Sequence, residues 1–228
     1  MSAIYDNVQQ VRSIISRQAA ATGRNPGEIT LVAVTKTVAP ELVQEALAAG
    51  VTDIGENKVQ EALSKSTCLG SGFNWHLIGH LQTNKVKAAV QLFALIHSVD
   101  SLKLIEAIDR EAGWIGKQQQ ILIEINISGE ESKYGCTPAD ALDMIRAASL
   151  KSNVHVAGLM TMAPFTADKD RIQAVFRGLR ELKDTIAGYH LPNIEMKHLS
   201  MGMSHDFEIA IAEGATLVRI GTAIFGKR

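Results

Sequence analysis

One lysine stands where it could do covalent chemistry. Residues 31–37 read LVAVTKT, so that Lys36 follows a run of apolar residues typical of a buried strand. A charged ammonium group in that position is costly unless it is paired or neutralised. A desolvated lysine amine loses its proton more easily, and the neutral amine can attack an aldehyde to form a Schiff base. Lys36 is therefore a candidate covalent anchor, with a buried ion pair and a surface lysine at a fraying strand end as the alternatives.

Two turns near the end of the chain could bind an anion. The motif HLSMGMSHD contains Ser200 and Gly202, and the motif RIGTAIFG contains Gly221 and Thr222; each leads into a helical pattern. Backbone N–H groups and hydroxyls at helix starts are suited to phosphate. Each turn alone is an ordinary loop, but the two together predict a phosphate site. Within the first motif, Ser204 is expected as a helix N-cap.

Other polar residues follow predicted strands. Asn57 in GENKVQE is either a site residue or the N-cap of the next helix. His76 and His80 lie on a strand and its turn rather than on one helix face, so they support a metal site only weakly and none is predicted. Arg219, just before the second turn, needs an acceptor if it points into a protein interior. A pyridine nitrogen and a carboxylate such as Glu124 are the two candidates.

Short β-branched runs alternate with helical patterns along the whole chain. This alternation predicts a (β/α)8 barrel, preceded by an amphipathic helix over 3–22. An open doubly wound sheet is the alternative, but it would need a Gly-rich turn after the first strand, which TKTVAP does not provide. In a barrel, active sites lie at the carboxyl ends of the strands. The predicted strands are 29–36, 52–56, 74–79, 94–99, 121–127, 154–160, 195–200 and 216–221.

Composition limits the class of protein. The 228 residues, 46% of them hydrophobic, suit one soluble domain over 1–228. A net charge of −1 gives no general attraction for nucleic acid or an anionic membrane. No apolar run approaches the ~20 residues of a membrane span, and the N-terminus does not resemble a signal peptide. Cys68 and Cys136 are expected to be reduced thiols, so we expect a cytoplasmic protein that binds neither nucleic acid nor membrane.

A reactive lysine and a phosphate site in one barrel suggest pyridoxal 5′-phosphate (PLP). The lysine would hold the aldehyde of this cofactor, and the turns would hold its phosphate. A phosphosugar aldolase of the Schiff-base type uses the same two features. The spacing of these residues does not distinguish between the two.

The motifs AVTKT, GENKVQE, WHLIGHLQTNK, GLMTM, LSMGMSHDFEIAI and RIGTAIFG together resemble those of the pyridoxal 5′-phosphate homeostasis proteins. These proteins are similar to the N-terminal barrel of alanine racemase standing alone. The resemblance implies an internal aldimine on a lysine, two residues flanking the cofactor ring, a phosphate site and an arginine facing the pyridine nitrogen. The implied aldimine lysine is Lys36, and the residues beside the ring are Asn57 and Met201. Arg219 is the implied arginine at the pyridine nitrogen. The implied phosphate site consists of Ser200, Gly221 and Thr222 with the backbone of Met201 and Gly202.

The resemblance also implies a function without established catalysis. Proteins of this family are thought to bind, buffer or deliver PLP, with apo-enzymes as recipients and with effects on amino-acid and keto-acid balance. A racemase needs a second acid/base group, which in alanine racemase is a tyrosine from another domain, and this chain is expected to lack that domain. Its three tyrosines, Tyr5, Tyr134 and Tyr189, are not expected at strand ends, and Pro40 stands where the racemase has a phosphate-binding tyrosine. We expect a monomer, with weak amino-acid racemase activity as the alternative.

Overall fold

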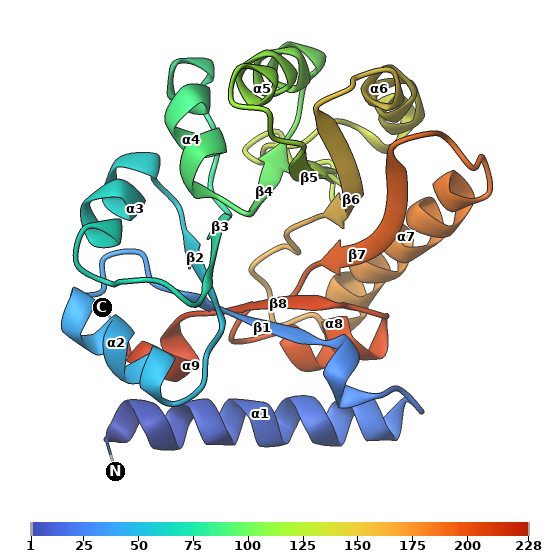
Figure 1. The fold of residues 1–228 in the computed structure, drawn as a ribbon. Helices are drawn as coiled ribbons and strands as arrows, with labels where there is room; N and C mark the ends of the chain where they lie inside the picture. Colours follow the sequence, from blue (N-terminus) through green and yellow to red (C-terminus); the bar gives the residue numbers. More distant parts are fainter. Residues whose placement is uncertain (1, 228) are drawn as a thin grey trace.

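Eight parallel strands form a closed barrel at the centre of the molecule (Figure 1). The computed structural model describes residues 2–227, and the strands follow one another around the barrel until β8 pairs with β1. The predicted barrel is therefore confirmed. The strands are β1 (Thr30–Val34), β2 (Asp53–Glu56), β3 (Asn74–Leu77), β4 (Leu95–Val99), β5 (Gln119–Glu124), β6 (Val154–Met160), β7 (Ile194–Ser200) and β8 (Leu217–Ile220).

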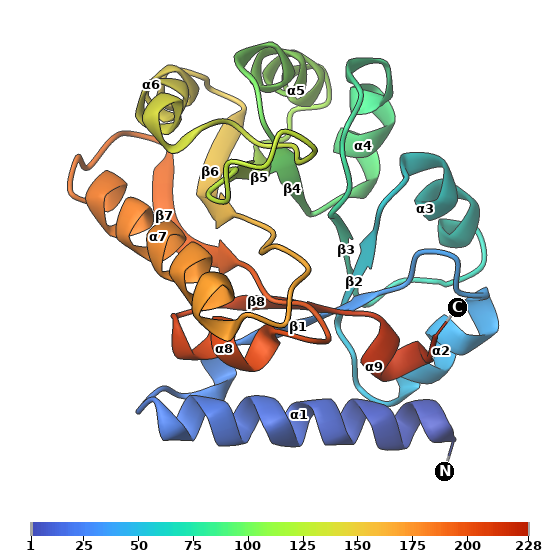
Figure 2. The same cartoon turned by 180° about the vertical axis from the view of Figure 1, so that it is seen from behind.

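Helices surround the barrel on the outside (Figures 1 and 2). Among residues 2–227, none of them combines the length and apolar character needed to cross a membrane. They are α2 (Pro40–Ala48), α3 (Val59–Ser66), α4 (Val86–Leu92), α5 (Leu102–Trp114), α6 (Pro138–Ser149), α7 (Lys169–Ala187), α8 (Phe207–Ala212) and α9 (Thr222–Phe225), with short 3-10 turns η1 (Pro26–Glu28) and η2 (Thr83–Lys85).

The leading helix α1 (Ala3–Ala21) packs across the outside of the barrel against α2, α8 and α9 (Figure 2). Its buried residues Ile4, Val8, Val11 and Ile15 recur at helical spacing, which confirms the predicted amphipathic helix. The Asn7 side chain donates a hydrogen bond of 2.8 Å to the Ile224 carbonyl of α9. This helix therefore braces the segment that follows β8.

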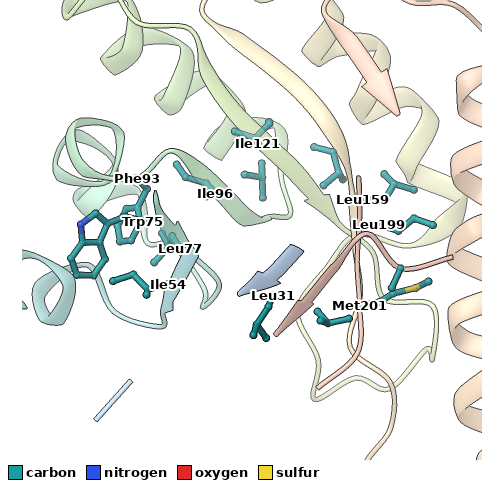
Figure 3. Packing of buried hydrophobic residues seen from close by; sticks show 14 of the residues in the cluster. Leu31, Ile54, Trp75, Leu77, Phe93, Ile96, Ile121, Leu159, Leu199 and Met201 are labelled. Carbon is teal, nitrogen blue, oxygen red and sulfur yellow. The ribbon is translucent and has the colours of Figure 1, made fainter. Parts of the chain in front are cut away.

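Alternation along the strands separates two sets of side chains. One set, which includes Leu31, Ile54 and Leu199, packs beneath the helices in the main hydrophobic cluster (Figure 3). The other set forms a smaller cluster of its own: Val32, Leu95, Leu122, Ala157, Met160 and Leu217. Because neighbouring residues of a strand face opposite sides, the second cluster lies inside the barrel.

Two of the strands that end before their predicted limits matter for the site. β1 stops at Val34 rather than at Lys36, and β5 stops at Glu124 rather than at Ile127. The Asn126 side chain donates to the Glu130 carbonyl at 2.9 Å and accepts from the Gly129 N–H at 3.0 Å. Asn126 therefore organises the loop after β5 instead of lining the barrel mouth.

Candidate functional site

A cavity of about 220 Å³ opens at the carboxyl ends of the strands. Seven of the eight strands, or the loops that follow them, contribute to its wall, which is the arrangement predicted for the active site of a barrel. The cavity is lined by Val34, Lys36, Asn57, Ile78, Gly79, His80, Glu124, Tyr134, Met162, Met203 and Arg219. The structure thus brings Lys36, Asn57 and Arg219 together, as the sequence predicted.

Lys36 lines this cavity and is exposed, which fits the alternative of a surface lysine at a strand end better than that of a buried ion pair. The turn that carries it is nevertheless held firmly. The next residue, Thr37, has a φ of 58°, in the left-handed region that a β-branched residue rarely adopts. The Thr37 N–H donates to Glu61 Oε1, and Lys65 Nζ donates to the same oxygen at 2.8 Å.

Lys65 ties this turn to the barrel. It is buried, and its Nζ donates to the Thr35 carbonyl and to Glu56 Oε1, each at 2.6 Å. The Thr35 hydroxyl donates to the same Glu56 oxygen at 2.6 Å. Burial raises the pKa of Glu56, while the hydrogen bonds from Lys65 and Thr35 work in the opposite direction. Thr35, before Lys36, and Thr37, after it, are therefore both tied to Lys65, Thr35 through Glu56 and Thr37 through Glu61.

Asn57 follows β2 directly and is not the N-cap of α3, which begins after Lys58. The reading of Asn57 as a helix cap is therefore wrong, and its place is the cavity wall. The end of β3 presses closely on it. A Cβ atom on Gly79 would lie 2.5 Å from the Asn57 carbonyl oxygen and 2.8 Å from its Cα.

We expect Gly79→Ala to displace Asn57 and to lower the free energy of unfolding by about 1–3 kcal/mol. The reason is that the added methyl group meets backbone atoms, which cannot rotate away. Gly188→Ala is the matched control, because its Cβ would meet no atom closer than 3.4 Å. Denaturant unfolding of both variants tests this, and equal stabilities for the two would contradict it.

Arg219 on β8 is 4% exposed and has no ion-pair partner among residues 2–227. Its guanidinium donates to Ser200 Oγ at 2.6 Å and to the Thr161 carbonyl at 3.0 Å. Burial lowers its pKa to about 10, while Glu124 and Asp206 raise it, so it stays protonated at neutral pH. The cavity wall therefore carries a positive charge that no carboxylate neutralises directly.

Glu124 faces the same cavity from the end of β5 and is 2% exposed. The Glu124 side chain therefore points into the barrel. Burial raises the pKa of Glu124 to about 7, with Asp100 adding to the effect and Arg219 opposing it. Glu124 therefore exchanges a proton near neutral pH.

The residues at the end of β7 and just after it lie in two different environments. The Ser200 hydroxyl points into the barrel, where it also contacts His97 Nδ1 at 2.8 Å. Met201 is fully buried in the outer hydrophobic cluster with Leu199 (Figure 3), and its side chain does not line the cavity. Met203 lines the cavity instead. Gly202 has a φ of 92°, and its carbonyl accepts from the Arg219 N–H at 3.0 Å.

The second predicted turn lies at the start of α9, just after β8. Gly221 precedes the helix and Thr222 begins it. Ser204 is not the N-cap of α8, contrary to the prediction, because α8 starts after Asp206. Its hydroxyl instead accepts from the Ala223 N–H in the first turn of α9 at 3.2 Å. The structure thus joins the two turns predicted to bind phosphate, through Ser204 rather than through the Ser200 hydroxyl.

Sequence reasoning missed one aromatic pair at the cavity. Tyr134 lines the wall from the loop after β5. No tyrosine is expected at a strand end, and Tyr134 reaches the cavity without standing at one. Its ring stacks on His80, with the ring centroids 4.2 Å apart and the planes at 15°. The two residues come from the loops after β5 and β3, so no local pattern indicates that they meet. The Gly-bounded stretch GEESKYG is the only sequence signal for this loop.

Comparisons with known proteins point to one family. The family model described as alanine racemase, N-terminal domain, matches residues 1–228. A protein of Aquifex aeolicus named pyridoxal phosphate homeostasis protein is 41% identical, and the match covers 98% of this chain and 97% of the relative. One of the same name from Pseudomonas aeruginosa is 41% identical over 100% of this chain and 97% of its own length.

A solved structure adds a bound ligand to this comparison. PipY of Synechococcus elongatus PCC7942, solved with PLP bound, is 37% identical with a TM-score of 0.82, covering 93% of this chain and 100% of PipY. The barrel is of the alanine racemase N-terminal-domain class. The sequence matches are more specific than this class, and the chain belongs to the family of pyridoxal phosphate homeostasis proteins.

Proposed function

We propose that this chain binds PLP in the cavity at the barrel mouth and acts in PLP homeostasis. The observation that carries the proposal is the cavity itself: Lys36 and Arg219 both line it, and Arg219 is buried, protonated and without a carboxylate partner among residues 2–227. A volume of about 220 Å³ suits a small ring compound better than a drug-sized ligand. The PLP-bound structure of PipY supports the same ligand.

Each part of the cofactor has a suitable partner in the site. PLP supplies an aldehyde that reacts with an amine, and Lys36 is the amine at the cavity wall. Asn57 lies beside the space for the ring. Ser204 and Thr222 do not line the cavity itself, and we propose that the Ser204 hydroxyl and the Thr222 N–H and hydroxyl hold the phosphate beside it, at the start of α9. The Arg219 guanidinium suits the pyridine nitrogen, which is a hydrogen-bond acceptor.

The same arginine supports a role in holding PLP rather than in catalysis. Because a guanidinium stays protonated and has no acceptor, it leaves the pyridine nitrogen without a proton. That arrangement weakens the cofactor as an electron sink. We infer that the chain, as one domain over 1–228 and as a monomer, buffers PLP in the cytoplasm or delivers it to apo-enzymes.

Reduction of the PLP-loaded protein with borohydride tests the covalent site. We expect mass spectrometry to find the pyridoxyl group on the peptide that contains Lys36, and Lys36→Ala to lose that label and the visible absorption band. Lys58→Ala is a matched control, because Lys58 lies close by but does not line the cavity. A colourless wild-type protein without label would refute the proposal.

Transfer of the cofactor tests delivery separately. Loaded protein and free PLP at equal concentration are each given to an apo-enzyme, and recovery of its activity is followed. Faster or fuller recovery with the loaded protein supports delivery. Recovery that only follows the release of free PLP supports buffering instead.

Tyr134 favours a second candidate function, weak racemisation of amino acids. A racemase needs two acid/base groups at the substrate, and Tyr134 and Lys36 both line the cavity. Incubation of the loaded protein with single amino acids in deuterated water tests this. Deuterium at the α-carbon that disappears in Tyr134→Phe would support racemisation, and no incorporation would exclude it.

A further inference from the structure

A chain of buried polar side chains crosses the barrel interior and ends at Arg219. Asp53 Oδ1 lies 3.0 Å from His76 Nε2, and His76 Nδ1 lies 2.9 Å from His97 Nε2. His97 Nδ1 then lies 2.8 Å from Ser200 Oγ, which Arg219 Nη1 contacts at 2.6 Å. All five residues are at most 8% exposed. They come from β2, β3, β4, β7 and β8, so only the closed barrel brings them together.

The two ends of this chain fix the protons between them. Arg219 can only donate, and an ionised Asp53 can only accept. Burial works to raise the pKa of Asp53, but hydrogen bonds from His76, Thr52 and Asn74 outweigh it and hold the pKa below its usual value. Each side chain between Arg219 and Asp53 must therefore donate its hydrogen bond to the neighbour on the Asp53 side.

This rule assigns both histidine tautomers. The Ser200 hydroxyl accepts from Arg219 and donates to His97 Nδ1, so His97 carries its hydrogen on Nε2. His97 Nε2–H donates to His76 Nδ1, and His76 Nε2–H donates to Asp53. The alternative is a cationic His76 with His97 protonated on Nδ1. In that arrangement none of the other four side chains could accept the hydrogen of the buried Ser200 hydroxyl, and an unsatisfied buried donor is costly.

We propose that His97 and His76 are positioning residues for Arg219. By accepting the Ser200 hydrogen, His97 keeps the Ser200 oxygen free to hold the guanidinium. The carbonyl of Thr161 holds the other Nη atom at 3.0 Å, so the two contacts fix the plane of the group. The row of hydrogen-bonded side chains begins at Asp53, at the opposite opening of the barrel. It thereby sets the direction in which the remaining N–H groups of Arg219 point.

The proton arrangement can be measured without any ligand. We expect ¹⁵N NMR of histidine-labelled protein to show His76 and His97 as neutral rings with hydrogen on Nε2. A hydrogen on Nδ1 of His97, or a cationic His76 at neutral pH, would overturn the proposal.

The effect on the site rests on the proposed function and is measured with PLP. We expect His97→Leu to weaken PLP binding about tenfold, because the Ser200 hydroxyl loses its acceptor. His97→Asn, whose side-chain oxygen can accept near the Nδ1 position, should stay within about threefold of wild type. His198→Asn is the matched control, because His198 contacts Thr216 and lies outside the chain; it should bind like wild type.

The outcomes separate the two proposals. If His97→Leu does not fold, Ser200→Ala cuts the same link with a smaller change in volume and should show the same loss. Wild-type protein that takes up no PLP would refute the proposed function. Wild-type protein that binds PLP, together with a folded His97→Leu or Ser200→Ala variant that binds it equally well, would refute the positioning role.

Discussion

Lys65→Met is expected to lower the free energy of unfolding by about 3–5 kcal/mol. Lys65 is 6% exposed and Glu56 is fully buried, and they are joined at 2.6 Å. Methionine fills a similar volume but leaves the Glu56 carboxylate without its cation. The second Glu56 oxygen, Oε2, has no hydrogen-bond partner among residues 2–227, so the Thr35 hydroxyl would be the one side-chain donor left to this carboxylate. Chemical denaturation at neutral pH gives the measurement.

The double variant Lys65→Met with Glu56→Gln is the control. It removes both charges, so we expect it to be more stable than Lys65→Met alone. The loss in Lys65→Met should also be smaller at pH 5 than at pH 8. Without Lys65 the pKa of Glu56 rises further, and the carboxyl escapes the penalty by taking a proton in acid. A pH-independent loss below about 1 kcal/mol would contradict this account.

The sequence predicts the barrel because each strand and helix carries its own local signal. Alternation in β5 places Glu124 inside, and the position of Lys36 after an apolar strand places it at the mouth. Pro40 begins α2, and Gly50, with a φ of 91°, follows its end, as the residue types predict. Features of this kind need no knowledge of the neighbouring strands.

Features that depend on several strands could not be predicted in the same way. Alternation stops being a guide after Ser200, because β7 ends there and Gly202 turns the chain; Met203 rather than Met201 therefore faces the cavity. The contact of His97 with Ser200 depends on the closed barrel bringing β4 and β7 together around its interior. Sequence alone gives both residues but no reason to pair them.

Glu124→Gln is expected to remove a pH dependence of stability worth about 3 kcal/mol. The pKa of Glu124 is raised from 4.5 to about 7, mainly by burial. Between these pH values the folded protein keeps a proton that the unfolded chain releases, so the free energy of unfolding falls as the pH rises. At 1.36 kcal/mol for each pH unit, the shift corresponds to about 3 kcal/mol. The free energy of unfolding of wild type, relative to that of Glu124→Gln, should therefore fall by about 3 kcal/mol between pH 4.5 and pH 8, as measured by denaturant unfolding.

Glu213→Gln is the control with the opposite sign. Burial works to raise the pKa of Glu213, but hydrogen bonds from Gln173 and Arg177 and the charge of Arg180 hold it below its usual value. Its contribution is therefore present above its unfolded pKa and is lost as the pH falls. Two buried glutamates thus give opposite dependences of stability on pH, because their hydrogen-bond and charge partners differ.

An anionic ligand in the cavity disfavours the ionised form of Glu124. Saturating PLP should therefore raise the pH at which Glu124 is half-protonated and leave that of Glu213 unchanged.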